Sequence, residues 1–99
     1  MTRPRRLDDG VVESWAAAHP RWRREGEHLV LEAQLPYDVG CALATASVPL
    51  VTDIDHHPVI TIGYDSLRIE LWTHDRGGVT QLDITFAEFV DKFLHERHL

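Results

Sequence analysis

Apolar residues recur along this chain with two different periods, and the change of period divides it into helices and strands. From residue 8 to about residue 18 the spacing is helical, which predicts an amphipathic helix capped by Asp8 or Asp9. The step His19-Pro20 ends this helix, because the residue before a proline is pushed out of the helical region. The predicted buried stripe consists of Val11, Val12, Trp15 and Ala18.

Two strands are expected after this helix. The first begins at Trp22 and turns at Glu25-Gly26-Glu27. In the second, over residues 29–35, the side chains alternate with a period of two, as in a strand that buries one face. The buried face of that strand would carry Leu29, Leu31, Ala33 and Leu35.

The second half of the chain has the same order and adds a last helix. A helix capped by Asp38 runs to about Ile54, with a kink or a break near residues 45–49, because Pro49 lacks a backbone donor. Residues 59–64 and 66–73 form two further strands around Asp65. Thr80 can cap the last helix, and Asp83 stands at the capping-box spacing. The apolar stripe of that helix is Leu82, Phe86, Phe89, Val90 and Phe93.

These elements predict one α+β domain with the order helix, two strands, helix, two strands, helix. Short hairpins favour a four-stranded antiparallel sheet, and three helices on one face would cover its apolar side chains. We place the domain at residues 8–95. Residues 1–7, which hold three arginines and a proline, are predicted to be disordered, and residues 96–99 are predicted to fray.

Composition restricts the classes of partner. The formal net charge of −6 argues against nucleic acid, since binding to phosphates depends on clustered Lys and Arg. The single cysteine, Cys41, cannot form an internal disulfide, which fits the reducing cytoplasm. Apolar runs stay well short of the ~18 residues that cross a bilayer, so no membrane partner is expected.

The candidate chemistry lies in three of the seven histidines. His56 and His57 precede a predicted strand, and His74 ends the strand that should pair with it. An antiparallel hairpin would bring these three imidazoles to one edge of the sheet. Imidazole titrates near neutrality, so one ring can act as an acid while another acts as a base. The remaining histidines are interpreted as solvated surface residues: His19, His28, His95 and His98.

The stretch DHHPVITIGYDSLRIELWTHDRGGVTQLD, residues 55–83, resembles the signature of the pterin-4a-carbinolamine dehydratases, also known as dimerisation cofactors of a homeodomain transcription factor. The shared positions are the paired histidines with Pro58, an aromatic residue at Tyr64, the histidine at 74 and the aspartate at 83. Trp22 also matches a tryptophan common in that family. The resemblance is strong over about thirty residues and extends coarsely over residues 8–94.

The resemblance implies a fold, an activity and a set of roles. The fold is a four-stranded antiparallel sheet with three helices on one face, assembled as a homodimer or homotetramer. The activity is dehydration of a 4a-hydroxytetrahydropterin to the quinonoid dihydropterin in tetrahydrobiopterin recycling. His56 and His74 would be the acid–base pair, in an order that the sequence leaves open. Neither a metal nor an organic cofactor is required, since both steps are proton transfers. The pterin-binding residues would be His57, Pro58, Trp22 and Asp83, the last of which could instead cap the helix.

This sequence departs from the family at several positions. The family usually has an acid four residues before the first histidine, where Thr52 stands here, and often another after the proline, where Val59 stands. Pro49 within the middle helix is also unusual. The alternative hypothesis is therefore a catalytically weak or inactive domain that acts as a dimerisation or assembly module. A zinc site formed by the three histidines, with Asp55 or Asp75, is a third interpretation.

Overall fold

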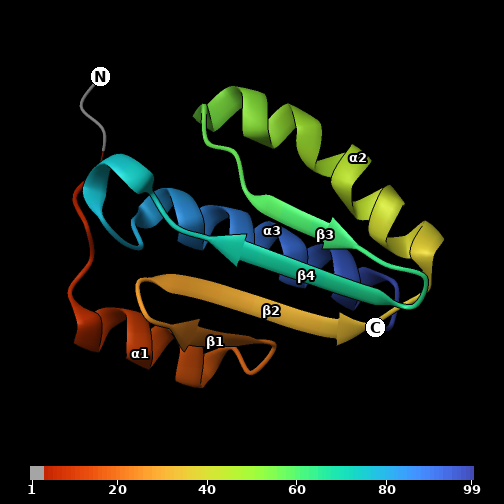
Figure 1. Cartoon of the computed structure of the whole chain (residues 1–99), viewed down its shortest axis with the longest axis horizontal. Coiled ribbons are helices and arrows are strands. Elements are labelled where there is room, and N and C mark those ends of the chain that lie inside the picture. Colours follow the sequence, from red (N-terminus) through yellow and green to blue (C-terminus); the bar gives the residue numbers. More distant parts are fainter. Residues whose placement is uncertain (1–3) are drawn as a thin grey trace.

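The structure is a computed structural model that describes residues 4–99. A helix, two strands, a second helix, two strands and a last helix follow one another, with a short 3₁₀ turn before the last (Figure 1). This order confirms the predicted α+β fold. The elements are α1 (Asp9–Ala18), β1 (Trp22–Glu25), β2 (His28–Gln34), α2 (Tyr37–Ile54), β3 (Val59–Ile62), β4 (Ser66–Leu71), η1 (His74–Arg76) and α3 (Gln81–Glu96).

The four strands form one antiparallel sheet in the order β1-β2-β4-β3. Within the two hairpins, β1 pairs with β2 and β3 pairs with β4. Strand β2 also pairs with β4 and so joins the two hairpins. One line of partners crosses the whole sheet from Trp22 through Leu31 and Ile69 to Ile60. The sheet therefore has β1 and β3 as its edge strands, and the start of β3 lies beside the end of β4.

Alternation along the two central strands divides the sheet into a core face and an open face. Leu29 and Leu31 of β2 and Ile69 and Leu71 of β4 are completely buried beneath the helices. The intervening residues of these strands carry polar or charged side chains, and Val30 is the buried apolar exception among them. Removal of the core-face side chains from water is the main force that holds the helices on the sheet.

Helix α1 differs in detail from the prediction. Asp8 occupies the N-cap position, but its side chain makes no capping hydrogen bond. Val12 is buried, whereas Val11, which we assigned to the buried stripe, is 52% exposed. The helix rests on β1, the edge strand, so only a narrow stripe can contact the sheet, and Val11 falls outside it.

Helix α2 is one continuous helix that contains Pro49, so of the predicted kink or break, the break does not occur (Figure 1). Pro49 removes the donor that would bond to the carbonyl of Thr45, but both residues lie on the exposed side, where water can take its place. On the opposite side, Gly40 allows close packing on β3: a Cβ there would lie 3.0 Å from the side chain of Ile62.

Helix α3 begins with the capping box that the sequence predicts. The Thr80 side chain accepts from the backbone of the first turn, and the Asp83 side chain accepts from the Thr80 N–H. Phe86, Val90 and Phe93 are buried against the sheet. The helix runs to Glu96, and the N–H of Leu99 donates to Leu94 O at 2.9 Å.

Of residues 1–7, for which the sequence predicts disorder, residues 1–3 lie outside the described part. The N–H of Leu7 donates to Val79 O at 2.8 Å, and Arg6 pairs with Glu27. Residues 4–7 therefore contact the domain. In the described part of the chain, residues 4–99, no helix has the length and apolar character needed to cross a membrane.

Candidate functional site

The candidate site lies where the β3–β4 hairpin is open. Val59, the first residue of β3, pairs with Glu70, the penultimate residue of β4. The residues just before β3, His56 to Pro58, therefore run beside those just after β4, which lead to His74. Helix α3 begins next to this edge, since Thr73 and Gly78 form an isolated bridge before it.

His56 is held by a carboxylate on the other side of this edge. Its Nε2 lies 2.5 Å from Oδ1 of Asp83 in the first turn of α3. Both side chains are buried, with 7% of His56 and 0% of Asp83 exposed. Asp55, which takes a left-handed conformation at the C-cap of α2, turns the chain so that His56 follows the helix directly into the interior.

Asp83 accepts hydrogen bonds from two further groups. The Thr73 hydroxyl donates to Oδ2 at 2.9 Å, and the backbone N–H of Thr80 donates to the same oxygen at 2.9 Å. The Thr80 hydroxyl accepts from the Leu82 N–H and lies 2.8 Å from the Thr73 hydroxyl, to which it can donate its own hydrogen. A carboxylate that accepts from Thr73 and Thr80 is placed to accept from His56 as well, so the Nε2 of that ring carries the hydrogen.

Of the other predicted site residues, His57, Pro58 and His74 are next to His56 or Thr73 in the chain, and Trp22 lies elsewhere. His74 follows Thr73 directly and is exposed, as is His57, whereas Pro58 is half-buried. Trp22 is not near them. It lies in β1 at the opposite edge of the sheet, is 3% exposed, and donates from its indole N–H to Asp91 at 2.9 Å.

Sequence reasoning missed Thr73 and the double role of Asp83. The capping-box spacing indicated Asp83 as a cap or as a site residue, and the structure has it cap α3 and bond to His56 at once. Thr73 carried no signal of its own, since a threonine at the end of a strand is common. His28 was interpreted as a solvated residue, but its ring stacks on Trp72 with centroids 4.1 Å apart.

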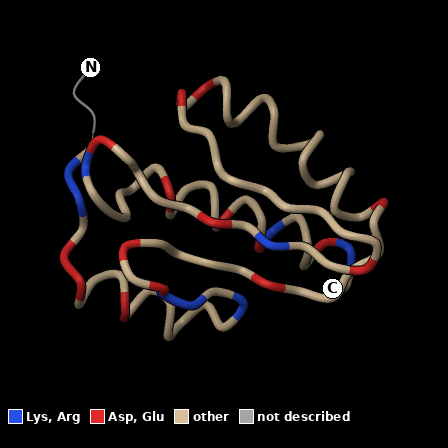
Figure 2. Tube along the Cα trace, viewed as in Figure 1, with Lys and Arg blue, Asp and Glu red and all other residues tan. Residues whose placement is uncertain are grey.

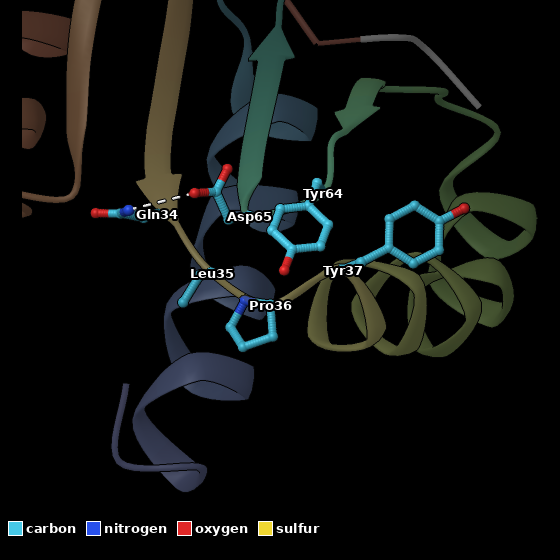
Figure 3. A pocket seen from close by; sticks show the side chains of 6 residues that line it. All are labelled: Gln34, Leu35, Pro36, Tyr37, Tyr64 and Asp65. Carbon is cyan, nitrogen blue, oxygen red and sulfur yellow. Dashed lines mark hydrogen bonds between the residues drawn. The ribbon is translucent and has the colours of Figure 1, made fainter.

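Two open hollows lie at the other end of the sheet, around the β3–β4 turn. One, of about 490 Å³, is lined by residues that include Pro36, Tyr37 and Tyr64 (Figure 3). The other, of about 540 Å³, lies beside the β3–β4 turn and includes Thr61 and Arg68. Neither is lined by an imidazole, so neither offers the acid–base pair that the sequence analysis required.

Ion pairs cover the open face of the sheet. Glu25 accepts from Arg23 and from Arg68, and these hydrogen bonds hold the pKa of its carboxyl below the usual value. Glu70 accepts from Arg68 and lies 3.3 Å from His28, and its pKa is lowered chiefly by the Arg68 hydrogen bond. These groups are paired and at least partly exposed, which is typical of a solvated surface rather than of a catalytic site.

Residues 4–99 hold no group of three or more His, Cys, Asp or Glu side chains arranged to bind a metal ion. The zinc interpretation required the three histidines to face one point. His56 instead directs Nε2 at Asp83, and adjacent His57 is exposed while His56 is buried. The described residues therefore do not form the three-histidine zinc site of that interpretation.

Comparisons with known proteins show the family of this chain. The family model described as "Pterin 4 alpha carbinolamine dehydratase" matches residues 5–93. A protein of Natronomonas pharaonis, named "Putative pterin-4-alpha-carbinolamine dehydratase", is 37% identical over 88 residues, covering 88% of this chain and 94% of that protein. A Thermomicrobium roseum protein of the same name is 35% identical over 83 residues, covering 83% and 89%.

A solved structure shows the same fold. The crystal structure of a "transcriptional coactivator/pterin dehydratase from Brucella Melitensis" superposes with a TM-score of 0.82 at 22% identity. The match covers 89% of this chain and 97% of that one. The order of helices and strands is thus that of a known architecture.

Proposed function

Because the chain belongs to the pterin 4 alpha carbinolamine dehydratase family, we propose that it dehydrates a 4a-hydroxytetrahydropterin with His56 and His74 as the acid–base pair. The hydroxyl on C4a leaves as water after it takes a proton from an acid. The N5–H gives its proton to a base, and the electrons of that bond form the C4a–N5 double bond of the quinonoid product. Two placed proton-transfer groups suffice for this reaction.

The observation that carries the proposal is the bond between His56 and Asp83. In the neutral ring, a hydrogen on Nε2 leaves a lone pair on Nδ1, so His56 suits the role of the base that takes the N5 proton. A carboxylate behind an imidazole has the same function in hydrolytic triads, where it fixes the tautomer and the orientation of the ring.

His74 is then the acid that protonates the leaving hydroxyl. Its neighbour Thr73 donates to the same carboxylate that binds His56, so the backbone at residue 73 has a fixed position relative to the base. His57 and Pro58, at the start of β3, would contact the pterin ring. Trp22 has no part in this proposal, because its ring is buried at the opposite edge of the sheet.

The test follows the absorbance of a 4a-hydroxytetrahydropterin after it is mixed with the protein. Wild type should dehydrate it faster than buffer does, and His56→Ala and His74→Ala should lose about 10²–10⁴-fold of the catalysed rate. His95→Ala is the matched control, since His95 is exposed on α3 and has no role in the proposal. Equal rates for buffer, wild type and both variants would refute the dehydratase function.

We also propose that the chain self-associates through α2 into a dimer or a tetramer, and that it acts in the cytoplasm. Helix α2 carries only Asp38 and Asp53 as charged residues, near its two ends (Figure 2). Tyr37 and Val48 on its outer surface are more than half exposed. A helix with large apolar side chains on both faces favours burial of the outer face against another chain.

The alternative hypothesis, a catalytically weak or inactive assembly module, is one possible outcome of the same assay. A protein that forms a defined oligomer but matches the buffer rate would be an assembly module of this family. The Brucella protein is named a transcriptional coactivator as well as a pterin dehydratase, which is the reason to test for this outcome.

A further inference from the structure

The N-terminal segment Pro4–Leu7 lies along the turn that carries His74. Figure 1 shows the segment rising from α1 beside η1. At one end the Leu7 N–H donates to Val79 O at 2.8 Å, and at the other end Nε of Arg76 donates to Pro4 O at 3.2 Å. The segment is therefore attached on both sides of Gly78, the residue that closes the turn.

Arg6 lies across Gly78 between these two attachments. A Cβ built on Gly78 would lie 2.5 Å from Arg6 Nε and 3.0 Å from Arg6 Cδ, so the guanidinium and its stem rest on the bare backbone of this glycine. Glu27, in the β1–β2 turn, binds Arg6 through both Nε, at 3.1 Å, and the terminal nitrogen. Asp9 accepts a further bond at 3.1 Å.

The backbone under Arg6 leads directly to the proposed acid and base. Gly78 O accepts from the Thr73 N–H at 2.8 Å. The Thr73 hydroxyl donates to Asp83, which binds His56, and His74 is the next residue along the chain. A displacement of Gly78 would therefore move Thr73 and, with it, His74, the proposed acid. It would also disturb Asp83, which accepts from Thr73 and holds His56, the proposed base.

We propose that Arg6, held by Glu27, is a positioning residue that fixes the backbone of Gly78 and so sets the separation of His74 and His56. We call the Arg6–Glu27 pair over Gly78 the clamp. The inference rests on the proposed dehydration. It extends the functional unit to the N-terminal segment and the β1–β2 turn, which carry neither of these two histidines. Arg6 and Glu27 are 38% and 50% exposed, so the clamp is sensitive to salt, and its contribution is graded rather than absolute.

The experiment measures kcat and KM for Arg6→Ala, Glu27→Gln and Arg6→Lys. The first two should lower kcat about threefold to tenfold with KM changed less than twofold, because the acid is displaced while the pterin contacts remain. Arg6→Lys keeps the charge and the stem over Gly78, so it should recover about half of the loss. Arg5→Ala, which removes a neighbouring exposed arginine, is the matched control and should match wild type.

A second variant tests the same contact from the other side. Gly78 has no left-handed backbone angle, so alanine can adopt its conformation, but the new Cβ must push Arg6 away. Gly78→Ala should therefore lower kcat like Arg6→Ala, and the double variant should be no slower than either single one. Additive losses, or a wild-type kcat in Arg6→Ala, would overturn the positioning role.

Amide hydrogen exchange makes this result independent of the reaction. In Arg6→Ala the Thr73 amide should exchange at least about fivefold faster, while amides of the β1–β2 ladder remain unchanged, and 1 M salt should bring wild type towards the variant. If wild type has no dehydratase activity but this exchange difference appears, the proposed function fails and the clamp stands. If Thr73 exchanges equally in both proteins, the clamp itself is refuted.

Discussion

At the scale of single residues, Asp83 has two functions, as a helix cap and as the hydrogen-bond partner of His56. It closes the capping box of α3 through the Thr80 N–H and binds His56 through its other oxygen. A buried carboxylate is costly unless each oxygen has donors, and here both oxygens have them. The start of α3 and the position of the proposed base are therefore set by one side chain.

Asp83→Asn should separate these two functions. An amide has one carbonyl oxygen, so if it accepts from Thr73 and Thr80 it must turn its NH₂ towards His56. That donor would force the His56 hydrogen onto Nδ1 and abolish its action as a base. We expect kcat to fall at least about tenfold, and the free energy of unfolding to fall by roughly 1–3 kcal/mol.

Absorbance kinetics and urea unfolding check this prediction. Asp91→Asn serves as the control, because Asp91 accepts from Trp22 about two turns along α3 from Asp83 and should affect stability without affecting kcat. An Asp83→Asn protein with wild-type kcat would show that the base does not depend on the carboxylate.

At the scale of elements, α2 shows how a helix can contain a proline without breaking. Pro49 stands five residues before the C-terminus of the helix, on its exposed side. The unbonded Thr45 carbonyl faces water there, and the Thr45 hydroxyl bonds back to Cys41 O at 2.9 Å. The buried side of the helix, at Leu43 and Ser47, keeps its contacts. The hydrogen bond that Pro49 removes is therefore lost on the solvent side of the helix, and the packing of the core is unaffected.

Pro49→Ala should recover part of this cost. Alanine restores the donor to Thr45 and removes the ring, so the free energy of unfolding should rise by about 1–2 kcal/mol. Thermal and urea unfolding measure the change. Thr52→Ala, on the same exposed side, is the control and should stay within about 0.5 kcal/mol. A loss of stability in Pro49→Ala would mean that the proline is required for the shape of α2.

At the scale of the whole molecule, the distribution of charge distinguishes two surfaces. The open face of the sheet is covered by paired Arg and Glu side chains, including Arg23, Glu32 and Arg68. The outer side of α2 has almost no charge (Figure 2). A chain of 99 residues buries only about 60–65% of its unfolded surface, so a further apolar interface would add stability.

Val48→Glu should therefore dissociate the oligomer. The charge would have to be buried unpaired in the proposed interface, which costs far more than the apolar contact it replaces. Sedimentation velocity should give one chain mass for the variant and a multiple of it for wild type. Val11→Glu is the matched control, because Val11 is 52% exposed, close to the 58% of Val48, but lies on α1. A wild-type monomer would contradict the proposed assembly.

The fold could be predicted largely from local sequence patterns. The alternation at Leu29 and Leu31 has the same meaning in any sheet, since a strand that covers a core must bury every second residue. The capping box of α3 is likewise local, because its two partners are three residues apart. The predictions were wrong where burial depends on how an element packs against the rest of the molecule. Val11 is an example, since its place on α1 leaves it exposed.

By itself, the sequence determined the order of elements, the strand periods and the spacing of the histidines, because each depends on residues close together in the chain. Only the tertiary structure decided that Thr73 joins the His56–Asp83 pair, that Trp22 stands at the far edge, and that Arg6 rests on Gly78. The Thr73–Asp83 bond joins residues ten positions apart, and the bond that holds Trp22 to Asp91 joins residues 69 positions apart. Their formation depends on how the hairpins and helices pack, which no local pattern encodes.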